Sequence, residues 1–338
     1  MKKLATSVFV LLLTAAVALS ASAQTIRRVS ATTTGTNIYA TFALAQTAAT
    51  AGDIIQVEPG TYNFDITLNK NLTVVGPGYF LGGSQNPGLQ ANAQAATVSN
   101  IQFNAGSTGA SVSGLTVASN VFIGANGVTL QRCNTSAGYI YLNYDNQTGY
   151  TAINNVNIRQ NYCGFIRQYS NGYAATNLLI TNNIIVYDIN MGTLASGEFR
   201  QNVMTDCCSY TAALNNFNVT NNYFGYQYGA PGFTNCTVNY NAFRFSGYPA
   251  TNNNINNVLP ANVFVMAPGT TQFDAWFQLK TGTNAMRGTG ENGLDMGAFA
   301  GNAPYKLGGL PAIPAIYQLS NSVNGNTLNV NMSTRSNN

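Results

Sequence analysis

Hydrophobic and polar residues alternate at period two through the middle of the chain, and the alternation returns in one recurrent phrase. The phrase is an apolar residue, any residue, an apolar residue, two mostly polar residues, Asn, and an apolar residue within two places, as in residues 156–163. It occurs seven times, with its Asn at Asn120, Asn161, Asn183, Asn202, Asn222, Asn241 and Asn262. From Asn161 onward the steps are 22, 19, 20, 19 and 21 residues. A fixed period of about twenty is typical of a solenoid, because one repeat cannot bury its apolar face until the next repeat stacks on it.

Period-two alternation predicts strands with one buried face, so the repeats are expected to form a parallel β-solenoid. The predicted inside positions are Val156, Ile158, Leu178, Ile180, Phe199, Phe217, Val219 and Val238 before the bend, with Cys163, Ile185, Met204, Phe224 and Phe243 after it. We expect the recurrent Asn at the bend, because Asn tolerates left-handed backbone. Stacked on one another, the seven Asn amides are expected to form a hydrogen-bonded ladder.

The chain divides into four predicted parts. Lys2 and Lys3 precede an apolar run that ends before Ala21-Ser22-Ala23, which is the build of a secretory signal with a mature start at Gln24. The predicted parts are a signal peptide (1–23), an N-terminal arm (24–36), the β-helix domain (37–303) and a Pro-containing tail with a final strand (304–338). The protein is therefore expected to be exported to the periplasm, the cell surface or the extracellular space, and no later run is long enough to span a membrane.

The two ends of the solenoid are expected to be covered. Residues 37–51, with Ile38, Phe42 and Leu44 apolar, predict a short amphipathic helix that caps the N-terminal end. The tail from Pro304 is punctuated by Pro, which bars a helix, so it is expected to lie extended along the coils. Residues 327–332 alternate as one last strand.

Composition narrows the classes of function. Only 7% of the 338 residues are charged and the net charge is +4, so neither a nucleic-acid footprint nor a polybasic membrane patch is visible. With no His, a Ser-His-Asp triad is excluded, and the five Cys do not form a zinc ligand set, so no metal site is predicted.

Both ends of the repeat region resemble known proteins. Ala51-Gly52-Asp53-Ile54-Ile55 through Pro59-Gly60-Thr61-Tyr62, and Leu72 to Gly76, look like the opening of right-handed parallel β-helix proteins of the pectin-lyase-like superfamily. Gly293-Leu294-Asp295-Met296-Gly297-Ala298-Phe299 is similar to a closing motif of secreted bacterial members, many from the Bacteroidetes. The resemblance covers about residues 37 to 300 and implies an all-β, right-handed parallel β-helix of about ten coils with an N-terminal cap and an extended C-terminal tail.

The superfamily includes polysaccharide lyases, glycoside hydrolases, esterases, adhesins and solenoids without chemistry, so fold alone does not select a function. For a lyase the resemblance implies an Arg or Lys base, with Ca²⁺ or a cationic side chain to stabilise the enolate. Glu198 and Arg200 place a carboxylate and a cation in one coil, and Arg159 is expected about 10 Å away, two coils along. Asp188 and Asp206 occupy nearby turns. The alternative is a surface ion pair between Glu198 and Arg200 with Arg159 in solvent.

Tyrosines crowd the middle of the chain and are the second group of candidates. Exposed aromatic rings flanked by amides suit sugar rings, and the predicted ligand-binding residues are Tyr144, Tyr169, Tyr173, Asp188, Asp206 and Tyr226. The alternative is that these rings only shield the loops. The favoured hypothesis is a non-catalytic, glycan-binding, adhesive or structural protein without a required cofactor, and the rival is a polysaccharide lyase with Ca²⁺. Self-assembly through open edge strands is a third option.

Overall fold

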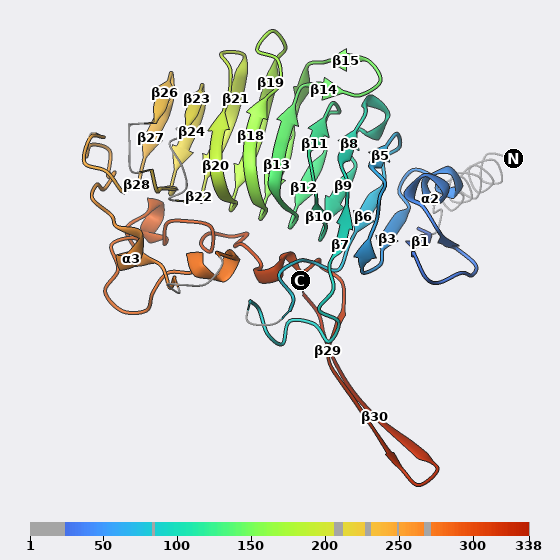
Figure 1. The fold of residues 1–338 in the computed structure, drawn as a ribbon. Helices are drawn as coiled ribbons and strands as arrows, with labels where there is room; N and C mark the ends of the chain where they lie inside the picture. Colours follow the sequence, from blue (N-terminus) through green and yellow to red (C-terminus); the bar gives the residue numbers. More distant parts are fainter. Residues whose placement is uncertain are drawn as a thin grey trace, which may run out of the picture.

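The computed structural model describes residues 24–82, 85–205, 212–226, 231–248, 250–266 and 272–337. Within these residues the protein is all-β apart from short helices, and two long parallel sheets make up the body (Figure 1). The parallel strands predicted from the alternation are confirmed, and the architecture is consistent with a parallel β-helix. In the described part of the chain no helix is long and apolar enough to cross a membrane.

The first sheet runs the length of the body. In spatial order its described strands are β2 (Ile38–Tyr39), β1 (Ile26–Val29), β3 (Ile54–Val57), β6 (Thr73–Val75), β9 (Ser111–Ser113), β12 (Thr129–Gln131), β17 (Asn157–Arg159), β19 (Ala175–Thr181), β21 (Ala195–Arg200), β24 (Phe217–Thr220) and β27 (Thr237–Asn239), with β16 (Ile153–Asn154) beside β19. Apart from β2 and β1, the spatial order follows the chain order, so each strand pairs with its counterpart from the next repeat.

The second sheet follows the same rule. Its described strands are β4 (Gly60–Thr61), β7 (Ala96–Val98), β10 (Thr116–Val117), β13 (Asn134–Leu142), β18 (Tyr162–Gln168), β20 (Ile184–Asn190), β22 (Val203–Met204), β25 (Tyr223–Phe224) and β28 (Ala242–Phe243), joined by β5 (Ile66–Leu68), β8 (Ile101–Phe103), β11 (Val121–Ile123), β23 (Ala213–Asn215) and β26 (Gly232–Thr234). We use "rung" for a stretch that contributes a strand to the first sheet and the following strand or strands to the second.

Apolar residues of successive rungs stack in register and form the core. On the first sheet one inward column pairs Ile158, Ile180, Phe199, Val219 and Val238. These side chains belong to a single buried cluster that also contains Ile166 and Ile189 of the second sheet. The core therefore lies between the two sheets, as the alternation predicted, because each strand has only one face to bury.

A short helix covers the N-terminal end. The helix α2 (Phe42–Ala48) begins after Thr41, whose hydroxyl oxygen accepts a hydrogen bond from the Leu44 amide at 3.4 Å. Phe42 and Ala45 are buried against the core, whereas Leu44 is 55% exposed. The predicted cap is present, but Leu44 lies on its outer face because it is two residues from Phe42 and not three or four.

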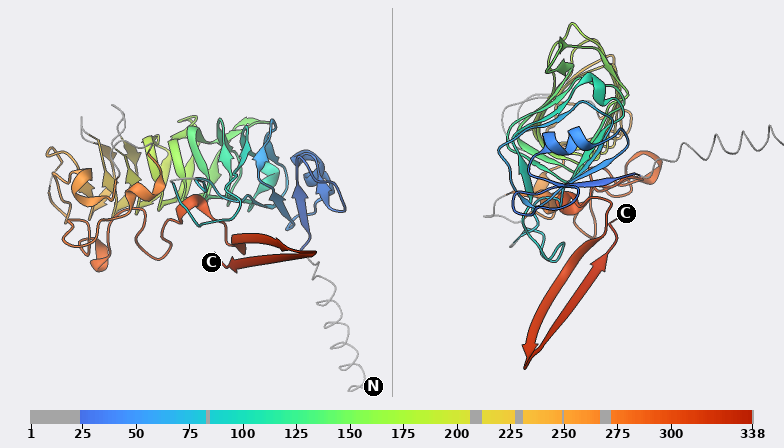
Figure 2. Two further views of the ribbon diagram at one scale, coloured as in Figure 1. Left: turned by 60° about the horizontal axis from the view of Figure 1, so that its bottom comes forward. Right: turned by 90° about the vertical axis from the view of Figure 1, so that its right-hand side faces the viewer.

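The chain after the last rung turns back and crosses the rungs. It contains α3 (Pro260–Val263) and the short 3-10 helices η2 (Asp274–Phe277), η3 (Glu291–Gly293) and η4 (Leu307–Gly309), with η1 (Ala105–Ser107) lying earlier in the chain. We call residues 286–310 the closing segment; it contains the motif of residues 293–299. Figure 2 shows this part of the chain, coloured orange to red, running along one side of the body.

Side chains at a corner of the rungs hold the closing segment. Asn182 Nδ2 donates to the carbonyls of Ala298 and Ala300, at 2.9 and 2.7 Å. Gln160 Nε2 donates to the Ala303 and Pro304 carbonyls at 3.1 and 2.7 Å. One rung further toward the N-terminus, a guanidinium nitrogen of Arg132 donates to the Leu310 carbonyl at 2.9 Å. The closing segment thus ties several rungs together across the strand direction.

The tail differs from the expectation beyond residue 314. Residues 304–310 lie along the rungs, but β29 (Ala315–Asn324) and β30 (Thr327–Arg335) form an antiparallel hairpin that projects from the body (Figure 1). The predicted last strand is present as part of β30. Residues 315–324 pair with it and do not follow the rungs, because the Asn324–Thr327 pair closes a tight turn around Gly325.

Candidate functional site

A column of buried Asn side chains lines one inner corner of the rungs. Asn161, Asn183, Asn202, Asn222 and Asn241 are each 0% exposed, and Asn254 is 4% exposed. Each Oδ1 accepts from the backbone N–H of the residue one rung back, as from Asn161 to Asn183 (3.0 Å) and from Asn202 to Asn222 (2.8 Å). Each Nδ2 also donates to a carbonyl of the rung before it, as from Asn202 to Ile180 at 2.9 Å. The column therefore satisfies backbone and side-chain groups that have no access to water.

Two predicted members do not belong to the column. Asn120 lies at another corner, where its Oδ1 accepts from the Tyr139 amide at 3.0 Å. In the two rungs before Asn161, Cys133 and Leu115 occupy the corner position. The residues that follow them, Asn134 and Thr116, are in register with Tyr162, the residue that follows Asn161. Asn262 is exposed in α3. The last member is instead Asn254, thirteen residues after Asn241, because the final rung is short.

The left-handed bend lies one residue before each column Asn. Positive φ angles are found at Gln160 (57°), Asn182 (55°), Gln201 (55°), Asn221 (60°) and Tyr240 (55°). The expectation that the repeated Asn itself adopts this conformation is wrong. The preceding residue makes the bend and projects outward, where Gln160 and Asn182 hold the closing segment, and the column Asn points inward.

The predicted catalytic residues share the outer face of the first sheet. Arg159 pairs with Thr181 and Thr181 with Arg200, so the two arginines occupy one outward column, two strands apart. Arg200 Nε lies 3.0 Å from Glu198 Oε2, and their side chains are 35% and 46% exposed. Arg159 Nε donates to Gln131 Oε1 at 2.8 Å. The structure therefore brings the three residues onto one surface, with both guanidinium groups already partnered.

That surface offers charge but little of what β-elimination requires. A guanidinium group carries positive charge and N–H donors and has no acceptor atom, so Arg159 and Arg200 suit the stabilisation of negative charge better than the removal of a proton. Glu198 supplies a carboxylate that is paired and partly exposed. Among the described residues, no group of three Cys, Asp or Glu side chains is placed to hold a metal ion.

A row of stacked aromatic rings covers the outer face of the second sheet. Tyr139 and Phe165 are paired in register, and their ring centroids lie 4.4 Å apart with an interplanar angle of 17°. Phe165 stacks on Tyr187 at 4.5 Å, and Tyr139 stacks on Tyr141 at 4.9 Å. Phe122 continues the row beyond Tyr141 at 5.7 Å. We call these five residues the aromatic row.

Beside the aromatic row lies a group of four tyrosines from two loops, which we call the tyrosine cluster: Tyr144, Tyr150, Tyr169 and Tyr173. Tyr144 and Tyr150 face each other in the small hairpin of β14 (Tyr144–Asp145) and β15 (Gly149–Tyr150). Tyr169 and Tyr173 follow β18, and neighbouring centroids lie 4.9 to 6.1 Å apart. Tyr150, Tyr169 and Tyr173 are 49%, 42% and 41% exposed. The rings are tilted against one another instead of stacked.

An ion pair between Arg167 and Asp188 packs against the aromatic row. Arg167 donates from Nε to Asp188 Oδ1 at 3.1 Å and from Nη2 to Oδ2 at 2.6 Å. Its guanidinium carbon lies 5.2 Å from the Tyr139 centroid and 5.1 Å from that of Phe165. The hydrogen bonds to Asp188 raise the pKa of Arg167, and partial burial raises the pKa of Tyr141.

Two predicted ligand-binding residues, Tyr226 and Asp188, are not part of an open surface. Tyr226 is 1% exposed and donates to the Tyr187 carbonyl at 3.0 Å, and burial raises the pKa of Tyr226 well above its ordinary value. Asp188 is 4% exposed because Arg167 covers it. Asp206 lies outside the described residues.

Sequence reasoning missed Phe122, Phe165 and Arg167 as members of this surface. Their signal was present in the period-two pattern, because Phe165 and Arg167 flank the buried Ile166 and so must point outward. The register between distant strands then brings Tyr139 beside Phe165. Comparison with known proteins finds no matching family, curated protein or solved structure. Any function assigned to this chain therefore depends on the geometry of its own residues.

Proposed function

We propose that this chain is an exported, right-handed parallel β-helix protein of the pectin-lyase-like type, and that it binds glycans without cleaving them. The two parallel sheets with one core between them support the β-helix. The observation that carries the binding proposal is the tyrosine cluster, in which three rings from adjoining loops are each more than 40% exposed.

The tyrosine cluster suits sugar rings better than the aromatic row does. In the aromatic row the interplanar angles between Tyr141, Tyr139, Phe165 and Tyr187 are 10 to 17°, so each ring face is covered by the next ring. In the tyrosine cluster the angles are 32 to 69° and part of each face remains open. An open aromatic face accepts the apolar side of a pyranose, while phenolic hydroxyls bond at its rim. The aromatic row is then the rigid support beneath the binding surface.

Binding is tested with the chain from Gln24 onward and a panel of neutral and acidic polysaccharides, with and without calcium. Co-sedimentation, chain shortening and the ultraviolet absorbance of unsaturated ends are recorded together. We expect retention by at least one neutral polymer, without shortening. Replacing Tyr150, Tyr169 and Tyr173 together with Ala is expected to weaken retention at least about tenfold, since each stacked ring contributes about 0.5 to 1.5 kcal/mol.

The matched control is Tyr317→Ala, which removes a tyrosine that is 37% exposed on the projecting hairpin. It is expected to leave retention unchanged. Equal losses in the triple variant and in Tyr317→Ala would refute the tyrosine cluster as the site. Cleavage that disappears in Arg200→Ala would replace this proposal with the polysaccharide lyase, acting at Arg159, Glu198 and Arg200.

A further inference from the structure

The projecting hairpin has two chemically opposite faces. Strand register places one set of residues on a single face that is entirely polar: Gln318, Ser320, Ser322, Asn324, Thr327, Asn329, Asn331 and Ser333. The other face, which we call the apolar face, consists of Leu319, Asn321, Val323, Leu328, Val330 and Met332. Such a division is found where one side of a sheet packs against something.

Nothing else in the described chain covers the apolar face. Its five apolar side chains expose between 55% and 73% of their surface. Together they make a patch on the order of a few hundred Å², which on a soluble protein marks an interaction site. A two-stranded hairpin is also marginal in water by itself, and both of its edges have unpaired backbone groups. The apolar face therefore needs a partner.

Charge favours a second copy of this chain as that partner. Residues 315–334 contain no Asp, Glu, Lys or Arg. An anionic lipid surface attracts Lys and Arg, and a charged protein surface needs complementary charge, so the hairpin offers neither of them a contact. The nearest cation, Arg335, donates to the Leu89 carbonyl at 2.7 Å and lies over the Tyr317 ring. Two neutral faces of the same kind meet without like-charge repulsion.

The arrangement of the apolar face is self-complementary. The Asn321–Val330 pair lies in the middle, the Leu319–Met332 pair toward the body and the Val323–Leu328 pair toward the tip. A two-fold axis that runs between the middle pairs of two copies places the tip of one hairpin over the base of the other. The Leu319–Met332 pair of each copy then meets the Val323–Leu328 pair of the other. Asn321 lies beside that axis, where the two amides bond each other and set the register.

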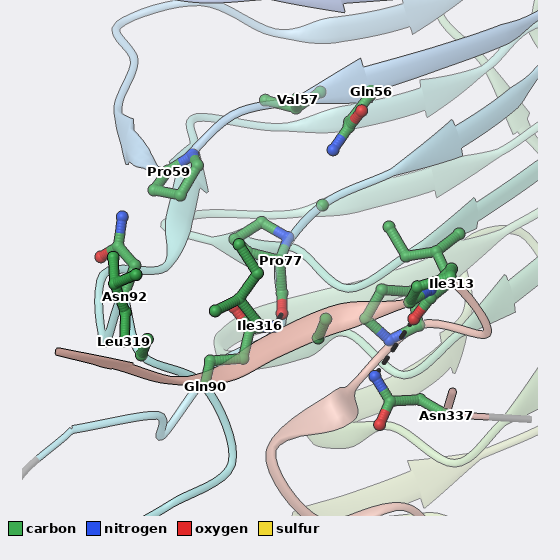
Figure 3. Close-up of a pocket in the computed structure, with 15 residues that line it drawn as sticks. Gln56, Val57, Pro59, Pro77, Gln90, Asn92, Ile313, Ile316, Leu319 and Asn337 are labelled. Atoms are coloured by element: carbon green, nitrogen blue, oxygen red, sulfur yellow. Dashed lines mark hydrogen bonds between the residues drawn. The ribbon is translucent and has the colours of Figure 1, made fainter. Parts of the chain in front are cut away.

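A cavity at the base of the hairpin continues the apolar face. It has a volume of about 450 Å³, and Leu319 of the apolar face lines it together with Ile316, Ile313 and Pro77 (Figure 3). Leu319 and Val323 are about 13 Å apart along an extended strand. In the two-fold arrangement, the tip residue Val323 of one copy comes next to the cavity of the other.

We propose that this hairpin is the interface of a homodimer in which two apolar faces pack together around a two-fold axis. Each copy contributes a few hundred Å², less than the roughly 800 Å² per partner of a standard stable interface, so the dimer is expected to be weak and reversible. Its dissociation constant is expected in the micromolar range. The inference is independent of the glycan-binding proposal.

Analytical ultracentrifugation of the chain from Gln24, from about 1 to 300 µM, tests the dimer across the expected range. Val330→Asp places a charge at the centre of the apolar face and is expected to raise the dissociation constant at least tenfold. Its matched control is Asn331→Asp, with the same charge on the polar face, and it is expected to leave the dimer intact. Both positions are exposed, so melting curves of the two variants should coincide with that of the unaltered chain.

Register is tested by cross-linking. Asn321→Cys is expected to form an intermolecular disulfide on oxidation, above the level seen with the native cysteines, whereas Ser322→Cys on the polar face is not. A chain that stays monomeric up to 300 µM would overturn the proposal. So would equal effects of Val330→Asp and Asn331→Asp, or capture of the hairpin by neutral lipid vesicles in place of a second copy.

Discussion

The asparagine column and the tyrosine cluster use repeated polar side chains in opposite ways. Asn202 is 0% exposed and its amide bonds to the neighbouring rung on each side, to Asn183 and to Asn222. Tyr173 is 41% exposed, and the ring that contacts it is that of Tyr150, itself 49% exposed. The first set is needed to build the stack, and the second leaves its surface available to a ligand. Burial, more than residue type, separates the two sets of side chains in this protein.

Breaking the asparagine column is expected to have the largest effect. Asn202→Leu removes the acceptor of the Asn183 backbone N–H and of the Asn183 Nδ2, in a site that excludes water. It also removes one of the donors to the Ile180 carbonyl and to Asn222 Oδ1, which keeps the bond from the backbone N–H of residue 202. The unpaired Asn183 N–H costs about 1 to 3 kcal/mol and each further hydrogen bond lost costs about 0.5 to 1.5 kcal/mol, so the total loss is expected to be about 3 to 5 kcal/mol. Chemical denaturation followed by far-ultraviolet circular dichroism measures it.

Asn262→Leu is the matched control, because it makes the same substitution at an exposed Asn outside the column. It is expected to change stability by less than about 0.5 kcal/mol. Similar denaturation midpoints for Asn202→Leu and Asn262→Leu would show that the hydrogen bonds of the column contribute nothing to the stability of the fold.

The buried carboxylate of Asp53, at the N-terminal end of the body, is expected to make the stability of the fold depend on pH. Burial alone would raise the pKa of Asp53, but hydrogen bonds from the amides of Thr50 and Thr25, from the Thr50 hydroxyl and the charge of Arg27 outweigh it and lower the pKa to about 2. A lowered carboxyl pKa stabilises the folded state above the unfolded value near 4, and this stabilisation is lost as the pH falls from about 4 to 2. The effect is expected to be about 1 to 2 kcal/mol once screening is allowed for.

The melting temperature of Asp53→Asn between about pH 2 and 6 checks this, since the variant should lose the part of the acid dependence between about pH 4 and 2. Asp295→Asn is the control, because Asp295 pairs with Arg287 at 3.4 Å on the exposed surface. If the unaltered chain and Asp53→Asn have parallel profiles down to pH 2, Asp53 does not stabilise this end of the body.

The smallest expected effect on stability is at the tyrosine cluster. Tyr173→Ala removes an exposed ring whose centroid lies 5.8 Å from the centroid of the Tyr150 ring. The loss in unfolding free energy is expected to stay below about 0.5 kcal/mol, because the ring is exposed. Thermal denaturation with the unaltered chain in parallel measures it. A drop of more than about 5 °C would mean that the cluster supports the rungs and is not a free surface.

Local pattern was enough to predict the strands and their inward residues. Ile158, Ile180 and Phe199 alternate with polar neighbours along the chain and stack in one column. The same pattern misplaced Asn120, because membership of the asparagine column depends on which strand pairs with β13, and no nearby residue encodes that pairing. It also missed Asn254, since the last rung is shorter than the others.

The sequence by itself determined the alternation, the period and hence the parallel strands, because a strand with one buried face must repeat every two residues. Only the tertiary structure decided that Tyr139 stacks on Phe165, that residues 298–310 cross the rungs at Asn182 and Gln160, and that the hairpin leaves the body with an uncovered face. The first two features join residues far apart in the chain. Their energy comes from contacts that exist only once the rungs have stacked.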